Sequence, residues 1–186
     1  MRQANTGHFD FTLMIDVPID IAYTTARDDI HKLTVYLPNI VHIKPVERKT
    51  EGDRTYIVNK FQGRSILPDS IGEIIKVPDV AWLDKGEWLD TEYTCNWRYE
   101  PFVFTEYLKV SGTSRMSPDG TRTSLRVTGD IYVNFLNYPL IPARLKDKIN
   151  VEITKALKAR IHSNFAALIK GIAAYAADTG LFVPRR

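Results

Sequence analysis

The residues of this 186-residue chain best suited to hold or transform a small molecule form an aromatic row between positions 93 and 99. Tyr93, Trp97 and Tyr99 alternate with polar neighbours, and the sole cysteine, Cys95, stands in the same row. Alternation with a period of two is typical of a strand that turns one face inward. Phenols and an indole on that face predict either a pocket wall that orients a ligand or an ordinary aromatic core.

Motifs for other kinds of chemistry are missing from the sequence. No histidine has a second histidine, cysteine or carboxylate at metal-ligand spacing, and a single cysteine excludes an intrachain disulfide. Phosphate-binding loops, dinucleotide fingerprints and nucleophile elbows are also absent from the sequence. Cys95 is disfavoured as a nucleophile because no histidine stands beside it. We therefore predict no metal site and no cofactor, and the sequence names no catalytic residue.

Polar residues occupy the opposite face of the same run. Asp90, Glu92, Asn96 and Arg98 are interpreted as solvated cross-strand partners. A shift of the register by one residue would turn this set inward and would favour catalysis instead.

Composition limits the classes of protein to consider. The net charge of +3, from 25 basic and 22 acidic residues, is too small to predict a nucleic-acid partner. Apolar residues make up 44% of the chain, which predicts one globular domain over residues 1–186 with a disordered tail at residues 1–7. The most apolar window, residues 165–177, is too short to span a bilayer, and the chain opens without a secretory leader. The expected location is cytoplasmic.

The elements that would position these residues are mostly strands. Residues 8–17 alternate as a half-buried strand, and short helices are predicted at residues 19–28 and 29–36. Further strand-like runs cover residues 40–49, 54–62, 70–76, a segment from Val80, 88–99, 105–116 and 121–135. Turn residues at positions 50–53 and 117–120 predict two hairpins. Asp84, Lys85 and Gly86 are interpreted as a bulge or another turn, and Gly129 as a place where a strand bends or leaves room.

A long helix is predicted to close the chain, over residues 142–178. Apolar residues recur there in steps of three and four, Pro142 suits a first helical turn, and Gly180 suits a stop. About 35 residues at about 1.5 Å each make a helix of about 50 Å, so a broad surface must cover its apolar stripe. The predicted fold is α+β, in the order β-α-α-β6-α: a curved antiparallel sheet of about seven strands around this C-terminal helix.

This order resembles the helix-grip fold of the START and Bet v 1-like (SRPBCC) superfamily, which includes polyketide cyclases, coenzyme Q-binding proteins and lipid-transfer domains. The residues most similar to those proteins are the strand–proline–helix join at residues 15–22, around Pro18, and the exit from the second helix at Tyr36 and Pro38. The resemblance implies an internal cavity between sheet and helix that binds an apolar ligand.

Three functions follow from this resemblance. The leading hypothesis is a non-enzymatic carrier or sensor of a hydrophobic small molecule such as a lipid, quinone or polyketide. The second is a cyclase, aromatase or dehydratase that uses polar cavity residues for acid–base chemistry. The third is an accessory factor that contacts a protein or a membrane through the apolar loop of residues 135–142, from Phe135 to Pro142. Strand parity and the helix stripe predict these cavity residues: Leu89, Tyr93, Trp97, Leu125, Val127, Ile131, Phe165 and Ile169.

Overall fold

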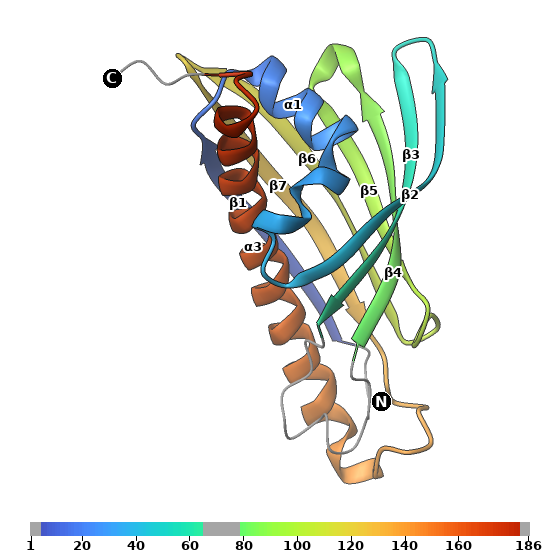
Figure 1. The fold of residues 1–186 in the computed structure, drawn as a ribbon. Helices are drawn as coiled ribbons and strands as arrows, with labels where there is room; N and C mark the ends of the chain where they lie inside the picture. The colour runs from blue at the N-terminus through green and yellow to red at the C-terminus, as the bar shows by residue number, and fades with distance from the viewer. Residues whose placement is uncertain (1–4, 65–78, 183–186) are drawn as a thin grey trace.

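A computed structural model describes residues 5–64 and 79–182, and these residues form one antiparallel sheet with helices against one face (Figure 1). Within this part of the chain the sheet has seven strands. They are β1 (Asn5–Ile15), β2 (Ile40–Glu51), β3 (Arg54–Arg64), β4 (Asp79–Leu89), β5 (Thr94–Pro101), β6 (Leu108–Asp119) and β7 (Arg122–Val133).

Two α-helices and three short 3-10 helices accompany the sheet in residues 5–64 and 79–182. The helices are α1 (Ile19–Asp28), η1 (Ile30–Tyr36), η2 (Asp90–Glu92), η3 (Ala143–Leu145) and α3 (Lys146–Asp178). Helix α3 has 33 residues and ends before Gly180, whose φ of 72° suits a residue without a side chain. The predicted helix-grip α+β fold is confirmed. No described helix is long and apolar enough to cross a membrane.

The strand order leaves the two halves of the sheet in different surroundings. The order is β1-β7-β6-β5-β4-β3-β2, and α3 packs mainly against β1 and β7 at one edge (Figure 1). Phe9, Val127 and Ile131 from this half are buried almost completely. Helices α1 and η1 pack on α3, and η1 also contacts β2 at the far edge. The space between the helices and strands β3 to β5 is therefore where a cavity can remain.

A pair of glycines lets two aromatic rings lie flat on the sheet. Gly112 of β6 and Gly129 of β7 are register partners. A Cβ on Gly112 would lie 2.6 Å from the Trp97 ring, and one on Gly129 would lie 2.6 Å from the Phe9 ring. Phe9 and Trp97 instead stack across this gap, with ring centroids 6.2 Å apart. Gly129 thus leaves room for a ring, one of the two roles that its place in the sequence suggested.

Several sequence-based boundaries change, among them the start of the long helix, which is Lys146 instead of residue 142. Strand β4 continues through Asp84, Lys85 and Gly86 with unbroken pairing on both sides, so their interpretation as a bulge or turn was wrong. The run at residues 88–99 is divided by η2, after which Tyr93 takes a left-handed φ of 49°. Strand β1 begins at Asn5, so residues 5–7 belong to it. The strand expected at residues 70–76 lies outside the described residues.

Candidate functional site: an aromatic chamber with a polar row

The candidate site is a chamber of about 110 Å³ between strands β3 to β5 and the helices α1, η1 and α3. One water occupies on the order of 10–15 Å³ on such a scale, so the chamber has room for a small ring-containing molecule. Its wall is mostly apolar and unusually rich in aromatic side chains. The aromatic residues of the wall are Tyr23, Phe61, Trp82, Trp88, Tyr93, Trp97, Tyr99 and Phe165.

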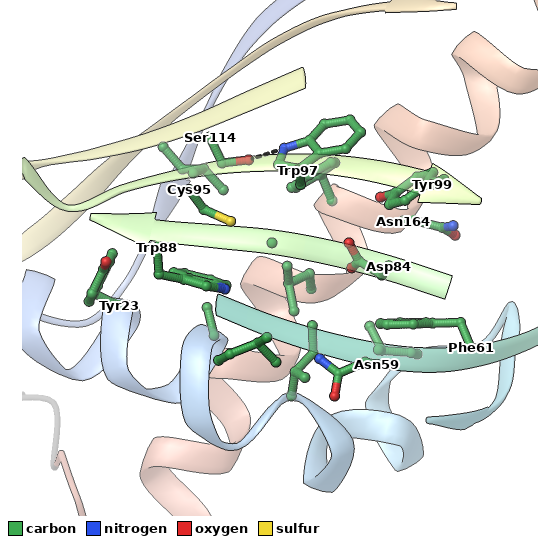
Figure 2. A pocket seen from close by; sticks show the side chains of 18 of the residues that line it. Tyr23, Asn59, Phe61, Asp84, Trp88, Cys95, Trp97, Tyr99, Ser114 and Asn164 are labelled. Carbon is green, nitrogen blue, oxygen red and sulfur yellow. Dashed lines mark hydrogen bonds between the residues drawn. The ribbon is translucent and has the colours of Figure 1, made fainter. Parts of the chain in front are cut away.

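A row of three polar side chains crosses this aromatic wall. Asn59 of β3 pairs in register with Asp84 of β4, and Asp84 pairs with Tyr99 of β5. Because register partners on adjacent antiparallel strands point to the same face, the three side chains stand side by side on the chamber wall. Figure 2 shows Asp84 between Asn59 on one side and Tyr99 on the other.

The Asp84 carboxyl is the one acidic group that lines the chamber among the described residues. Burial alone raises its pKa from 3.8 to about 7, and no described residue forms an ion pair or hydrogen bond with it. Burial also raises the pKa of Tyr99 and of Cys95, with the charge of Asp84 as a further cause. Both groups are therefore neutral near pH 7, and Cys95 is a poor nucleophile because it holds its proton.

An indole N–H is a second polar group without a partner. Nε1 of Trp82 is buried and has no hydrogen-bond partner in the described part of the chain. Nε1 of Trp97, by contrast, donates to Oγ of Ser114 at 2.9 Å (Figure 2). A buried donor without an acceptor is costly, and such a group in a chamber wall marks a position where a ligand atom could accept.

Two stacked ring pairs flank the polar row. Phe61 and Trp82 stack with centroids 5.3 Å apart, and Trp97 and Tyr99 stack with centroids 4.8 Å apart. Trp82 and Tyr99 also approach each other at 6.0 Å, so the two pairs are in contact. Phe165 of α3 closes the chamber from the helix side, 5.9 Å from Trp97.

Phenols at the other end of the chamber have structural partners. Tyr23 donates to Asp90 at 3.0 Å, and Tyr93 donates to Asp20 at 2.7 Å. Arg27 forms an ion pair with Asp90 at 2.7 Å. Burial, followed by the hydrogen bond to Asp90, raises the pKa of Tyr23. These hydroxyls brace α1 against η2 and β5, whereas the hydroxyl of Tyr99 makes no such bond among the described residues.

The structure brings four of the eight predicted cavity residues together around the chamber: Tyr93, Trp97, Leu125 and Phe165. The other four lie elsewhere. Val127 and Ile131 are fully buried in the core, Leu89 is the last residue of β4, and Ile169 packs against the core from α3. The prediction that these eight residues contact a ligand remains a prediction.

Sequence reasoning missed the residues of β3 and β4 that line the chamber. Asn59 and Phe61 alternate on β3, and Trp82 and Asp84 alternate on β4. The alternation from Trp82 to Trp88 was the available signal. The interpretation of Asp84–Gly86 as a turn hid it, because an acidic residue, a lysine and a glycine in succession are typical of turns.

A second chamber of about 90 Å³ adjoins the first. Ile40, Trp82, Tyr99 and Asn164 line both, so these four side chains form the partition between them. Two arginines, Arg64 and Arg160, line the second chamber, whereas no described basic residue lines the first.

The loop of residues 135–142 packs mainly against the protein. Phe135 and Ile141 are each 2% exposed, and Tyr138 meets Phe135 in a cluster with Phe104 and Tyr107. Leu140, at 67%, is the large apolar side chain of this loop that is exposed. Within residues 5–64 and 79–182, no group of three or more His, Cys, Asp and Glu side chains could hold a metal ion.

The seven-stranded sheet, the N-terminal helices and the long α3 together define a helix-grip fold with an internal chamber. No protein-family model and no curated protein matches the sequence. Solved structures do match. TTHA0849 from Thermus thermophilus has a TM-score of 0.66 and 19% identity, over 91% of this chain and 99% of that chain. The Zhui aromatase/cyclase from Streptomyces sp. R1128 has a TM-score of 0.67 and 15% identity, over 92% and 94%.

Norcoclaurine synthase from Thalictrum flavum is also similar, with a TM-score of 0.57 and 14% identity over 93% of this chain and 87% of that chain. At these identities the likeness establishes the fold. An aromatase/cyclase and a norcoclaurine synthase share this fold while their names describe different reactions, so the function must be argued from the chamber itself.

Proposed function

We propose that this protein binds a hydrophobic, ring-containing small molecule in the chamber, as a carrier or sensor. The observation that carries the proposal is the wall of eight aromatic side chains crossed by the row Asn59–Asp84–Tyr99. Apolar walls with a few convergent polar groups are characteristic of small-molecule sites, since the rings supply affinity and the polar groups fix orientation. Lipids, quinones and aromatic polyketides are the ligand classes to test.

Native mass spectrometry of the purified protein, followed by solvent extraction, tests this proposal. The expected result is a bound species, or a rise in melting temperature on adding fatty acids, quinones or aromatic polyketides. Leu168→Trp should abolish either signal, because Leu168 lines the chamber and a larger side chain would fill it. Val35→Trp is the matched control, because Val35 is 83% exposed and this substitution places the same indole on the surface, away from the chamber. Absence of binding by every class would overturn the proposal.

Asp84 supports a second candidate function, an enzyme that transfers a proton to or from a ring-containing substrate. A carboxyl whose pKa lies near 7 suits a general acid or base at neutral pH, and Asp84 stands beside the phenol of Tyr99 on the chamber wall. This arrangement would serve the cyclase or aromatase chemistry considered from the sequence.

A flat, activated probe tests for such proton transfer. In 5-nitrobenzisoxazole a base removes the proton on carbon 3, the N–O bond breaks, and a coloured cyanophenolate forms. The wild type should accelerate this ring opening with a rate that rises as pH passes through about 7, and Asp84→Asn should lose the acceleration. Asp130→Asn, on the outer face of the sheet, is the control. Equal rates for wild type and Asp84→Asn would exclude Asp84 as the base.

A further inference from the structure

Among the described residues, no basic side chain lines the chamber beside the Asp84 carboxyl. We propose that the first chamber recognises a protonated amine carried on an aromatic or apolar body, with Asp84 as the counter-ion of the amine. The inference rests on the proposed binding function and specifies the ligand class. It starts from the contents of the wall, where the described residues include one carboxyl and no lysine, arginine or histidine.

The other titratable groups on the wall do not neutralise Asp84. They are Tyr23 of α1 and Tyr93, Cys95 and Tyr99 near or on β5, while β3, η1 and α3 contribute apolar and amide side chains. Burial raises the pKa of Cys95 and Tyr99, so both stay uncharged at neutral pH. Arg64 and Arg160 belong to the second chamber, beyond the partition. An ionised Asp84 therefore makes the first chamber negative, and a ligand cation is the partner that the protein itself does not supply.

The rings beside Asp84 favour the same kind of ligand. Trp82 and Asp84 alternate on β4, and the Trp82 ring stacks on Phe61 and approaches Tyr99. The faces of Trp, Tyr and Phe attract cations, most strongly where water is excluded. A carboxylate among ring faces thus offers an ammonium both a charge partner and a π surface, and the rest of the wall accepts the apolar body.

A different ligand chemistry competes with this one. A neutral Asp84 could donate a hydrogen bond to a ligand carbonyl, with Nε1 of Trp82 as a second donor. The two chemistries have opposite pH dependence. An amine requires the ionised carboxyl, so its affinity falls as pH drops below about 7. A carbonyl requires the protonated carboxyl, so its affinity falls as pH rises above that value.

Three probes with the same phenethyl group distinguish the two chemistries. Phenethylamine, propylbenzene and 4-phenylbutan-2-one share one ring and a short chain, and differ in an ammonium, a methyl and a carbonyl group. Dissociation constants would be measured by calorimetry at pH 8.5 and 5.5 for the wild type, Asp84→Asn and the control Asp130→Asn. Phenethylamine stays protonated at both pH values, as alkyl amines do.

We expect phenethylamine to bind the wild type at least tenfold more tightly than propylbenzene at pH 8.5. Its affinity should fall roughly 30-fold at pH 5.5, since a carboxyl of pKa about 7 is only about 3% ionised there. Asp84→Asn should lose both the preference for the amine and the pH dependence, which would assign both to the Asp84 carboxyl. Asp130→Asn should behave as the wild type.

Each of the remaining outcomes would overturn either the amine inference alone or the amine inference together with the binding function. Equal binding of phenethylamine and propylbenzene, or a preference for 4-phenylbutan-2-one that grows as pH falls, would overturn the amine inference while leaving the binding function intact. Failure of all three probes to bind at millimolar concentration would overturn both the amine inference and the proposed binding function for ligands of this size.

Discussion

The Asp84 carboxyl, which has no partner among the described residues, makes the stability of the fold depend on pH in a direction opposite to the usual one for an acidic residue. The folded state holds the proton of Asp84 up to about pH 7, whereas the unfolded chain releases it near pH 3.8. Between these values the folded state binds more protons, so the free energy of unfolding falls as pH rises. The decrease in the free energy of unfolding caused by Asp84 is absent below about pH 4 and reaches its full size above about pH 7.

Asp84→Asn should therefore stabilise the protein at pH 8 and change little at pH 4. The gain at pH 8 relative to pH 4 should approach 4 kcal/mol at most, from about 1.4 kcal/mol for each unit of pKa difference. Urea unfolding at a series of pH values measures it, with Asp130→Asn as the exposed control. A gain that is equal at both pH values would show that Asp84 is not the group that titrates.

Gly129 carries a second prediction for a single residue. In Gly129→Ala the new methyl group would lie 2.4 Å from the carbonyl oxygen of Ser111 and 2.8 Å from Cα of Gly112. Both contacts are with backbone, so β6 and β7 would have to separate, and we expect a loss of about 3 kcal/mol in urea unfolding. Ser111→Ala, on the exposed face of the adjacent strand, should change stability by less than about 0.5 kcal/mol. A similar effect of the two substitutions would contradict the packing argument.

At the scale of elements, the spacing of apolar residues and the positions of turn-forming residues predicted most of the fold from sequence alone. The hairpin between β6 and β7, the join of β1 to α1 and the long helix α3 all follow from local residue types. Strand β4 did not, because its charged residues and Gly86 are typical of a turn in isolation. Pairing with β3 and β5 overrides that local preference and turns Asp84 inward.

The use of strand alternation to predict inward-facing residues also explains why half of the predicted cavity residues do not line the chamber. Alternation assigns a side chain to the inner face but not to a position along the sheet. Val127 and Ile131 face inward on β7, where α3 covers them directly, and are 0% exposed. Trp97 faces inward on β5, farther from the helix, and lines the chamber. Which inward residues reach open space depends on where α3 crosses the sheet, a tertiary property that the strand pattern does not contain.

The junction of β7 with α3 yields a prediction about an element. Asn150 of α3 is 1% exposed and accepts a hydrogen bond from the backbone N–H of Phe135 at 2.8 Å, which ties the loop of residues 135–142 to the helix. Asn150→Ala should cost about 2 kcal/mol, because the Phe135 N–H would stay buried without this acceptor. Hydrogen exchange should show faster exchange at Phe135 than in the wild type.

Glu152→Ala is the comparison for this junction. Glu152 pairs with Lys155 at 3.2 Å on the solvent side of α3, so its loss should cost less than about 0.5 kcal/mol. Unchanged exchange at Phe135 in Asn150→Ala would show that the aromatic cluster of Phe104, Tyr107, Phe135 and Tyr138 holds the loop by itself.

At the scale of the whole molecule, the chambers show how a helix-grip fold tolerates space inside. The core under α3 at β1 and β7 is filled, and the space remains where strands β3 to β5 diverge from the helix. A partition of four side chains then divides that space into two parts of similar size. The partition therefore limits the length of a ligand that fits in the first chamber, and Trp82 is the largest side chain of the partition.

Trp82→Leu should join the two chambers and change which ligands fit. We expect the tightest-binding member of a series of n-alkylbenzenes to shift to a chain several carbons longer, because the added space is apolar on the side of Val110 and Leu157. The loss of ring packing on Phe61 should cost on the order of 3 kcal/mol in stability, so binding is measured well below the melting temperature. Trp88→Leu is the matched control, since Trp88 lines only the first chamber. If both variants prefer the same chain length as the wild type, the chambers are not connected through Trp82; if both shift equally, the added volume rather than the partition decides the length.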